Sequence, residues 1–135
     1  MITRFAVDTS AVVDLMRVDR PIPPPLLQEN IKVFLPLPVL GELYVGALSS
    51  KRRDFNMNLL HRVATRWALL DPHESTARIY AQLRVESRNL AELSASKRND
   101  YWIAALCIER DLPLLTNDRG FDAIAGLSVL HWDSK

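Results

Sequence analysis

Arg4-Phe5-Ala6-Val7-Asp8-Thr9-Ser10-Ala11-Val12-Val13 is the stretch that decides the fold. It opens with a short apolar run at residues 5–7, continues with three polar residues, and leads into apolar residues at helical spacing. This order predicts a buried strand, a turn and a helix. It also leaves an acidic residue, Asp8, at the end of the first strand.

The same alternation of short apolar strands and helices continues along the chain. Further strands are predicted at residues 33–35, 67–70, 112–116 and 127–130, and helices at 39–48, 55–63, 72–83 and 99–110. Asp71 is predicted to cap the third of these helices, with Glu74 completing a capping box. Strands that are apolar on both faces are typical of a parallel sheet covered by helices, so the fold class is α/β.

Length and composition indicate a single folded domain over residues 1–135. The 135 residues are 48% hydrophobic and 24% charged, with a net charge of +1 and one cysteine. Disorder, a disulfide and a cysteine-rich zinc site are therefore excluded, and any electrostatic steering of nucleic acid must come from local patches. Without a signal peptide or a long apolar span, the protein is expected in the cytoplasm.

Two carboxylates follow predicted strands directly. In open α/β sheets, ligands bind beyond the carboxyl ends of the strands. Asp8 follows the first strand, and Asp118 follows the strand that ends at Thr116. Each has an alternative local role, because Asp8 could cap the next helix and Asp118 lies in a turn-like sequence.

Two further acids lie in predicted helices. Glu42 has no basic residue three or four positions away, so it needs solvent or a partner from elsewhere in the fold. Asp100 is predicted near the start of the helix at 99–110, where its negative charge could interact favourably with the helix dipole or pair with Lys97. A metal ion would be a suitable partner for Glu42, and Asp100 is expected to point to the same edge of the sheet as Asp8.

Four motifs together resemble the PIN-domain nucleases, and among them the VapC-type toxins of bacterial toxin–antitoxin pairs. They are Val7-Asp8-Thr9-Ser10, Val39-Leu40-Gly41-Glu42-Leu43, Asn99-Asp100-Tyr101-Trp102-Ile103-Ala104-Ala105 and Leu114-Leu115-Thr116-Asn117-Asp118-Arg119-Gly120-Phe121. Each motif is weak alone, but their order along nearly the whole chain is specific.

The resemblance implies a three-layer α/β/α sandwich with a central, mainly parallel sheet. It also implies a homodimeric endoribonuclease that depends on Mg²⁺ or Mn²⁺, cleaves RNA and is inhibited by a VapB-like antitoxin. The family's four catalytic and metal-binding acids correspond to Asp8, Glu42, Asp100 and Asp118. The supporting polar residues correspond to Thr9, Ser10, Asn99 and Thr116.

One position departs from the family pattern. Many members have a further acid two residues after the position of Asp118, and this chain has Gly120 there. Binding of a second metal is therefore open. Asp122 lies in a different register and is expected to face solvent in a short helix.

Oxygen ligands without histidine or cysteine suit Mg²⁺, whereas the scattered His61, His73 and His131 do not suggest zinc. A metal-bound water would attack phosphorus, so no side-chain nucleophile is required. Asp100 is the expected proton acceptor.

Lys97 and Arg98 lie beside the expected site and are candidates for contacts to RNA phosphates.

Other chemistries compete with the nuclease interpretation. An aspartyl phosphotransferase could use Asp8, but a haloacid-dehalogenase-like enzyme has a second Asp where this chain has Ser10. A receiver domain would need adjacent acids after the first strand, which are missing. A non-catalytic RNA- or protein-binding domain remains the main alternative, although all four acids are intact.

Overall fold

Five strands form one sheet in the computed structural model, which describes residues 2–87 and 95–132. They are β1 (Arg4–Val7), β2 (Lys32–Pro36), β3 (Ala68–Leu70), β4 (Leu114–Leu115) and β5 (Val129–Leu130). Their order is β3-β2-β1-β4-β5, and every pair of neighbours is parallel. The predicted fold class is confirmed, and the described strands are wholly rather than mainly parallel.

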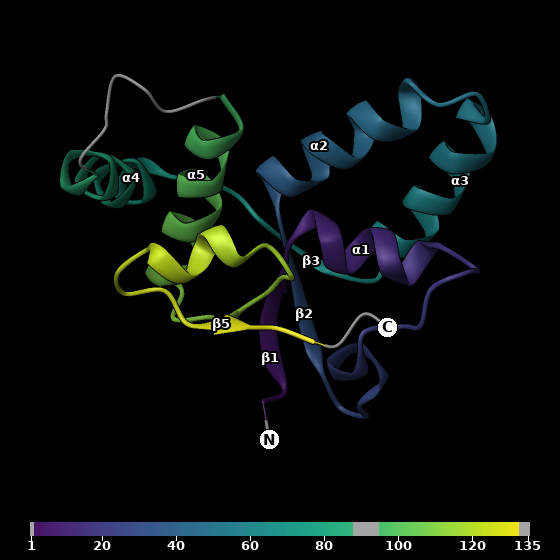
Figure 1. Cartoon of the computed structure of the whole chain (residues 1–135), viewed down its shortest axis with the longest axis horizontal. Coiled ribbons are helices and arrows are strands. Elements are labelled where there is room, and N and C mark those ends of the chain that lie inside the picture. Colours follow the sequence, from purple (N-terminus) through teal and green to yellow (C-terminus); the bar gives the residue numbers. More distant parts are fainter. Residues whose placement is uncertain (1, 88–94, 133–135) are drawn as a thin grey trace.

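Helices cover both faces of this sheet. They are α1 (Thr9–Met16), α2 (Leu37–Leu48), α3 (Arg53–Ala64), α4 (Glu74–Glu86) and α5 (Ala95–Glu109), with short 3-10 helices η1 (Pro24–Leu27) and η3 (Arg119–Ala123). Figure 1 shows α4 and α5 on one side of the strands and α1 and α3 on the other. The result is the expected three-layer sandwich.

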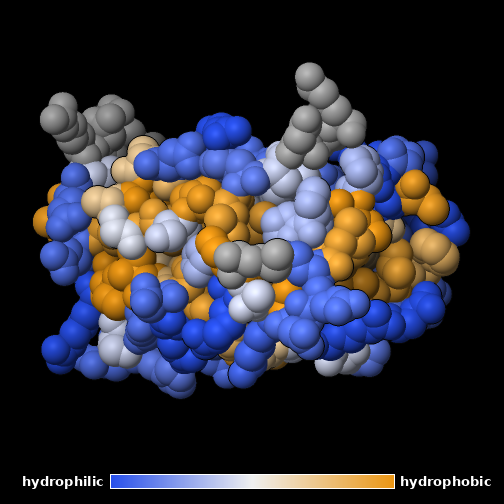
Figure 2. All heavy atoms as spheres, turned by 90° about the horizontal axis from the view of Figure 1, so that it is seen from below, coloured by the Kyte–Doolittle hydropathy of each residue, from blue (hydrophilic) through white to orange (hydrophobic). Residues whose placement is uncertain are grey.

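The core lies between the sheet and these helices. Phe5, Leu35 and Leu115 from the strands and Leu106 from α5 are fully buried. Cys107 is also fully buried, as an inert thiol would be. On the amino-terminal side of the sheet, Figure 2 shows apolar patches bordered by hydrophilic side chains. Among the described residues, no helix is long and apolar enough to cross a membrane.

Several predicted boundaries are wrong by a few residues. The ladder of β4 covers only residues 114–115 and that of β5 only 129–130. Helix α4 begins after His73 rather than after Asp71, and the His73 backbone amide donates to Thr76 Oγ1 at 3.0 Å. The predicted Asp71–Glu74 capping box is therefore replaced by a start two residues later.

Helix α5 begins at Ala95, four residues before the predicted start at Asn99. Alanine, lysine and arginine are good helix formers, and no proline interrupts residues 95–98, so the helix extends upstream. Asp100 consequently lies in the second turn of α5 and not at its head.

The strand order reverses direction between β1 and β4. From β1 the chain moves outward through β2 and β3, then returns to place β4 on the opposite side of β1. In doubly wound sheets, ligands bind at the carboxyl ends of strands where this reversal occurs. Residues that follow β1 and β4 therefore lie at the position that most favours a site.

Candidate functional site

Asp8 lies at the centre of the candidate site. It follows β1 and occupies the N-cap position of α1, but its side chain makes no capping hydrogen bond. Instead Asp8 Oδ2 accepts a hydrogen bond from Thr116 Oγ1 at 2.7 Å. Burial raises the pKa of Asp8, and the Thr116 hydroxyl partly opposes this rise. The alternative role as a helix cap does not explain this carboxylate.

Thr116 connects the ends of the two central strands. Its side chain is fully buried, and its hydroxyl accepts a hydrogen bond from the Asp118 backbone amide at 3.0 Å. Ser10 Oγ lies 3.4 Å from Thr116 Oγ1 and accepts from the Asn117 amide at 3.1 Å. Because the single Thr116 proton is given to Asp8, Ser10 must be the donor in their contact. These hydroxyls fix the loop after β4 against α1.

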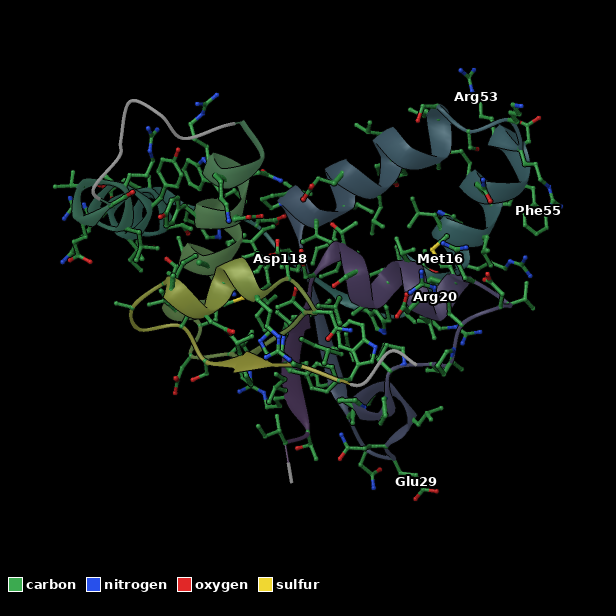
Figure 3. All side chains as sticks on the ribbon, viewed as in Figure 1. Met16, Arg20, Glu29, Arg53, Phe55 and Asp118 are labelled. Carbon is green, nitrogen blue, oxygen red and sulfur yellow. The ribbon has the colours of Figure 1, made fainter. Side chains whose placement is uncertain are left out.

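Asp118 follows this loop and lies between α5 and α1 in the view of Figure 3. It caps η3, where its Oδ1 accepts from the Gly120 amide at 2.8 Å. The side chain is exposed, and one carboxylate oxygen is thereby held at a defined position. Asp118 therefore stabilises a turn, as its local sequence suggested, and also lies at the candidate site.

Glu42 reaches the same region from α2. Its Oε1 accepts from Asn99 Nδ2 at 2.8 Å and, more weakly, from Thr9 Oγ1 at 3.5 Å. Burial raises the pKa of Glu42, and the Asp8 charge adds to the rise, while these two hydrogen bonds oppose it. The partner that Glu42 lacks within α2 is thus supplied by α5 and α1.

Asp100 is the most strongly perturbed acid of the site. Burial first, and then the charges of Asp8 and Asp118, raise its pKa from 3.8 to about 7, while the charge of Lys97 partly opposes the rise. Since like charges disfavour the ionised form, these mutual effects indicate that the carboxylates lie close enough to interact.

One pocket of about 470 Å³ collects all four predicted acids. Lys97, Thr9 and Ser10 also line it, whereas Arg98 does not. Asp14 was not predicted but lines the same pocket, with a buried side chain 3.7 Å from Arg20 Nη1. Its position one helical turn after Ser10 on α1 was the available signal for it.

The donor set suits a hard divalent cation, but not one bound directly by all four acids. Among residues 2–87 and 95–132, no three acid, histidine or cysteine side chains are placed to hold one metal ion. Mg²⁺ commonly takes one or two carboxylates and keeps several waters. The carboxylates that line the pocket fit an ion held in this way by one or two of them.

Gly120 lies close to two charged side chains. A Cβ atom placed on Gly120 would lie 2.5 Å from Lys97 Nζ and 3.0 Å from Asp118 Oδ1.

Asp122 does not line the carboxylate pocket, as its register suggested. As expected, Asp122 is exposed in the short helix η3, and its Oδ1 also lies 2.8 Å from His131 Nε2 in the segment after β5.

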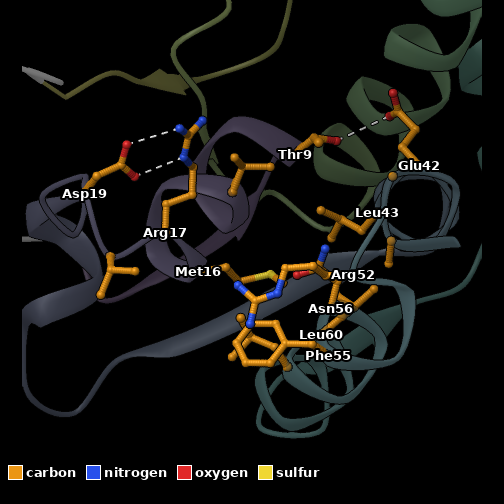
Figure 4. Close-up of a pocket in the computed structure, with 15 residues that line it drawn as sticks. Thr9, Met16, Arg17, Asp19, Glu42, Leu43, Arg52, Phe55, Asn56 and Leu60 are labelled. Carbon is orange, nitrogen blue, oxygen red and sulfur yellow. Dashed lines mark hydrogen bonds and ion pairs between the residues drawn. The ribbon is translucent and has the colours of Figure 1, made fainter. Parts of the chain in front are cut away.

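An apolar groove of about 380 Å³ adjoins the carboxylate pocket. Met16, Leu43, Ala47 and Leu60 line it, from α1, α2 and α3. Phe55 forms part of its wall beneath Arg52, whose guanidinium lies 4.0 Å from the ring centre (Figure 4). Thr9, Val13 and Glu42 line both the groove and the carboxylate pocket, so the two are continuous.

Comparison with known proteins places the chain in a family. The PIN domain family matches residues 5–127. Ribonuclease VapC5 of Mycobacterium tuberculosis is 35% identical over 98 residues, which cover 68% of each chain. Ribonuclease VapC2 of Rickettsia felis is 28% identical over 109 residues, which cover 80% of each chain.

A solved structure supports the same assignment. The crystal structure of VapBC2 from Rickettsia felis, bound to a DNA fragment from its promoter, contains a chain with a TM-score of 0.80 and 25% identity. The match covers 96% of this chain and 99% of that one. On the family match, the relatives and the shared fold, this chain belongs to the PIN domain family and, within it, to the VapC type.

Proposed function

We propose that this protein is a Mg²⁺- or Mn²⁺-dependent endoribonuclease that acts as the toxin of a toxin–antitoxin pair. The observation that carries the proposal is the gathering of Asp8, Glu42, Asp100 and Asp118 in one pocket at the switch point of the sheet. VapC-type relatives named as ribonucleases support the same chemistry.

When bound, the divalent cation would lower the pKa of a coordinated water and neutralise charge on the phosphate. The chain itself supplies the position of the site. Thr116 holds Asp8 by a hydrogen bond of 2.7 Å, and Asn99 holds Glu42 by one of 2.8 Å. Fixed carboxylates cost no reorganisation during the reaction, which favours catalysis.

The roles of the side chains follow from their surroundings. Asp8 is the most buried of the four acids and is the proposed principal ligand. Asp100 is half-buried and open to the pocket, which makes it the proposed acceptor of the water's proton. Lys97 lines the pocket as a cation suited to a phosphate oxygen, while Arg98 would contact RNA only outside it.

The test is cleavage of RNA by the purified protein with Mg²⁺ or Mn²⁺. We expect cleavage by the wild type, its loss with excess EDTA, and at least a hundredfold reduction in Asp8→Asn. If Asp8→Asn folds and cleaves at the wild-type rate, the activity does not come from this site. If wild type binds RNA but never cleaves it, the non-catalytic alternative is correct.

The partner is proposed to be a VapB-like antitoxin, since neighbours of this fold were solved as VapBC complexes. The apolar groove between α1, α2 and α3 is the proposed docking surface, because it leads directly to Glu42 and Thr9. An apolar antitoxin segment in the groove would cover the entrance to the acids. A homodimer and a cytoplasmic location complete the proposal, and sedimentation of the isolated chain tests the dimer.

A further inference from the structure

Lys97 enters the carboxylate pocket beside Gly120, a residue without a side chain. The ammonium nitrogen lies 2.5 Å from the position that a Cβ atom of residue 120 would occupy. Any side chain at this position would therefore displace the end of Lys97. Asp118 Oδ1 lies 3.0 Å from the same point, so the ammonium group is on the Asp118 side of the pocket.

The positive charge of Lys97 lies close enough to the carboxylates of the pocket to interact with them. Lys97 lines the pocket together with Asp8, Asp100 and Asp118, and it is among the groups whose charge affects Asp100. Four carboxylates in one pocket favour nearby cations. An ammonium group is a compact point charge on a flexible stem and cannot leave by diffusion.

From this geometry we infer that Lys97 is a fixed cation of the active site, which limits the protein to one divalent ion and contacts the RNA phosphate. A second divalent ion on the Asp118 side would meet the positive charge of Lys97 and find no carboxylate at residue 120. The ammonium group instead neutralises this side of the pocket and offers donors to a phosphate oxygen. The inference rests on the proposed metal-dependent function.

The experiment counts Mn²⁺ ions by calorimetric titration and electron paramagnetic resonance, without RNA and without an activity assay. The variants are Lys97→Met, Gly120→Asp and the double variant Lys97→Met/Gly120→Asp. Arg98→Met is the matched control for charge, because Arg98 is the next residue on α5 but does not line the pocket. Gly120→Ala is the control for the added side-chain volume.

We expect one Mn²⁺ per chain in the wild type, in both controls and in Gly120→Asp, where the new carboxylate pairs with Lys97. The double variant is expected to bind two. Without Mn²⁺, Lys97→Met should melt at a lower temperature than Arg98→Met, because repulsion among the acids is then unopposed.

Three outcomes are distinguishable. Two ions in the wild type, or still only one in a folded double variant, would overturn the role of Lys97 but leave the proposed nuclease intact. Failure of the wild type to bind any Mn²⁺ would overturn the proposed metal-dependent function itself. Circular dichroism of each variant establishes that it is folded before ions are counted.

Discussion

The surroundings of Asp100 oppose the ionisation of its carboxyl group. Burial first, and then Asp8 and Asp118, raise its pKa from 3.8 to about 7 in the metal-free protein. The folded state therefore holds its proton more tightly than the unfolded state does. Stability from this residue is fully present below about pH 4 and is lost as the pH rises through about 7.

Asp100→Asn should remove this loss, because the amide carries no charge at any of these pH values. We expect the metal-free variant to melt at a higher temperature than the wild type at pH 8, with the difference disappearing near pH 4. Melting curves in EDTA between these limits provide the measurement, and RNA cleavage should be abolished. A variant that unfolds yet retains activity would show that Asp100 is structural.

Thr116 allows a separate test of how the site is positioned. Thr116→Val keeps the side-chain shape but removes the donor to Asp8 Oδ2 and the acceptor for the Asp118 amide. Leaving buried polar groups without partners should lower the free energy of unfolding by about 1–3 kcal/mol. Mn²⁺ affinity should fall as well, because Asp8 is no longer held.

Thr116→Ser is the matched control, since it retains the hydroxyl. Urea denaturation measures stability, and calorimetric titration measures Mn²⁺ affinity. If Thr116→Val and Thr116→Ser behave alike in both measurements, the hydroxyl network does not position Asp8.

At the scale of elements, the connection from α5 to β4 contains a residue with a strained backbone conformation. Asp111 adopts a positive φ of 53° directly after the helix. The Leu112 amide donates to Cys107 O at 2.9 Å and the Asp111 amide to Ile108 O at 3.2 Å. This pair of bonds is a Schellman motif, in which glycine is the preferred residue at the left-handed position.

Asp111→Gly should therefore stabilise the protein by about 0.5 kcal/mol, because relief of the left-handed strain slightly exceeds the added freedom of the unfolded chain. The effect should appear in urea denaturation without a change in Mn²⁺ affinity. Asp111→Ala is the opposite control and should not stabilise, since alanine keeps the Cβ atom. Equal stability of the glycine and alanine variants would contradict the role of the backbone conformation.

The elements also explain which features could be predicted from sequence. The apolar runs around Phe5 and Leu115 are buried on both faces of the sheet, so their pattern identified strands and the acids that follow them. The upstream extension of α5 to Ala95 could not be predicted from the hydrophobic pattern alone. The approach of Lys97 to Gly120 depends on how α5 packs beside η3, which no local pattern encodes.

At the scale of the whole molecule, the carboxylate pocket and the apolar groove share a wall. Thr9, Val13 and Glu42 line both, so a partner that fills the groove would extend to the edge of the carboxylate pocket. Figure 4 shows Glu42 and Thr9 at one end of the groove and Phe55 and Arg52 at the other. This continuity connects the proposed inhibition by an antitoxin with the proposed catalytic site.

Two glycines on α2 provide a matched pair for testing the groove. Gly46 lines it and Gly41 does not, and a Cβ atom on either would meet nothing within 4 Å. Gly46→Trp should fill the groove and weaken antitoxin binding at least tenfold, while Gly41→Trp should bind normally. Both substitutions replace a helical glycine with the same residue, so their effects on helix stability should be similar.

The measurement is a calorimetric titration of each variant with the purified VapB-like antitoxin, which is to be identified from the neighbourhood of this chain's gene. In parallel, RNA cleavage by each variant is followed as the partner is added. We expect Gly46→Trp to retain cleavage but resist inhibition, because its carboxylates and their hydrogen bonds are unchanged. Normal inhibition of a folded Gly46→Trp variant would place the antitoxin elsewhere, whereas loss of cleavage without the partner would show that the groove also guides RNA to the acids.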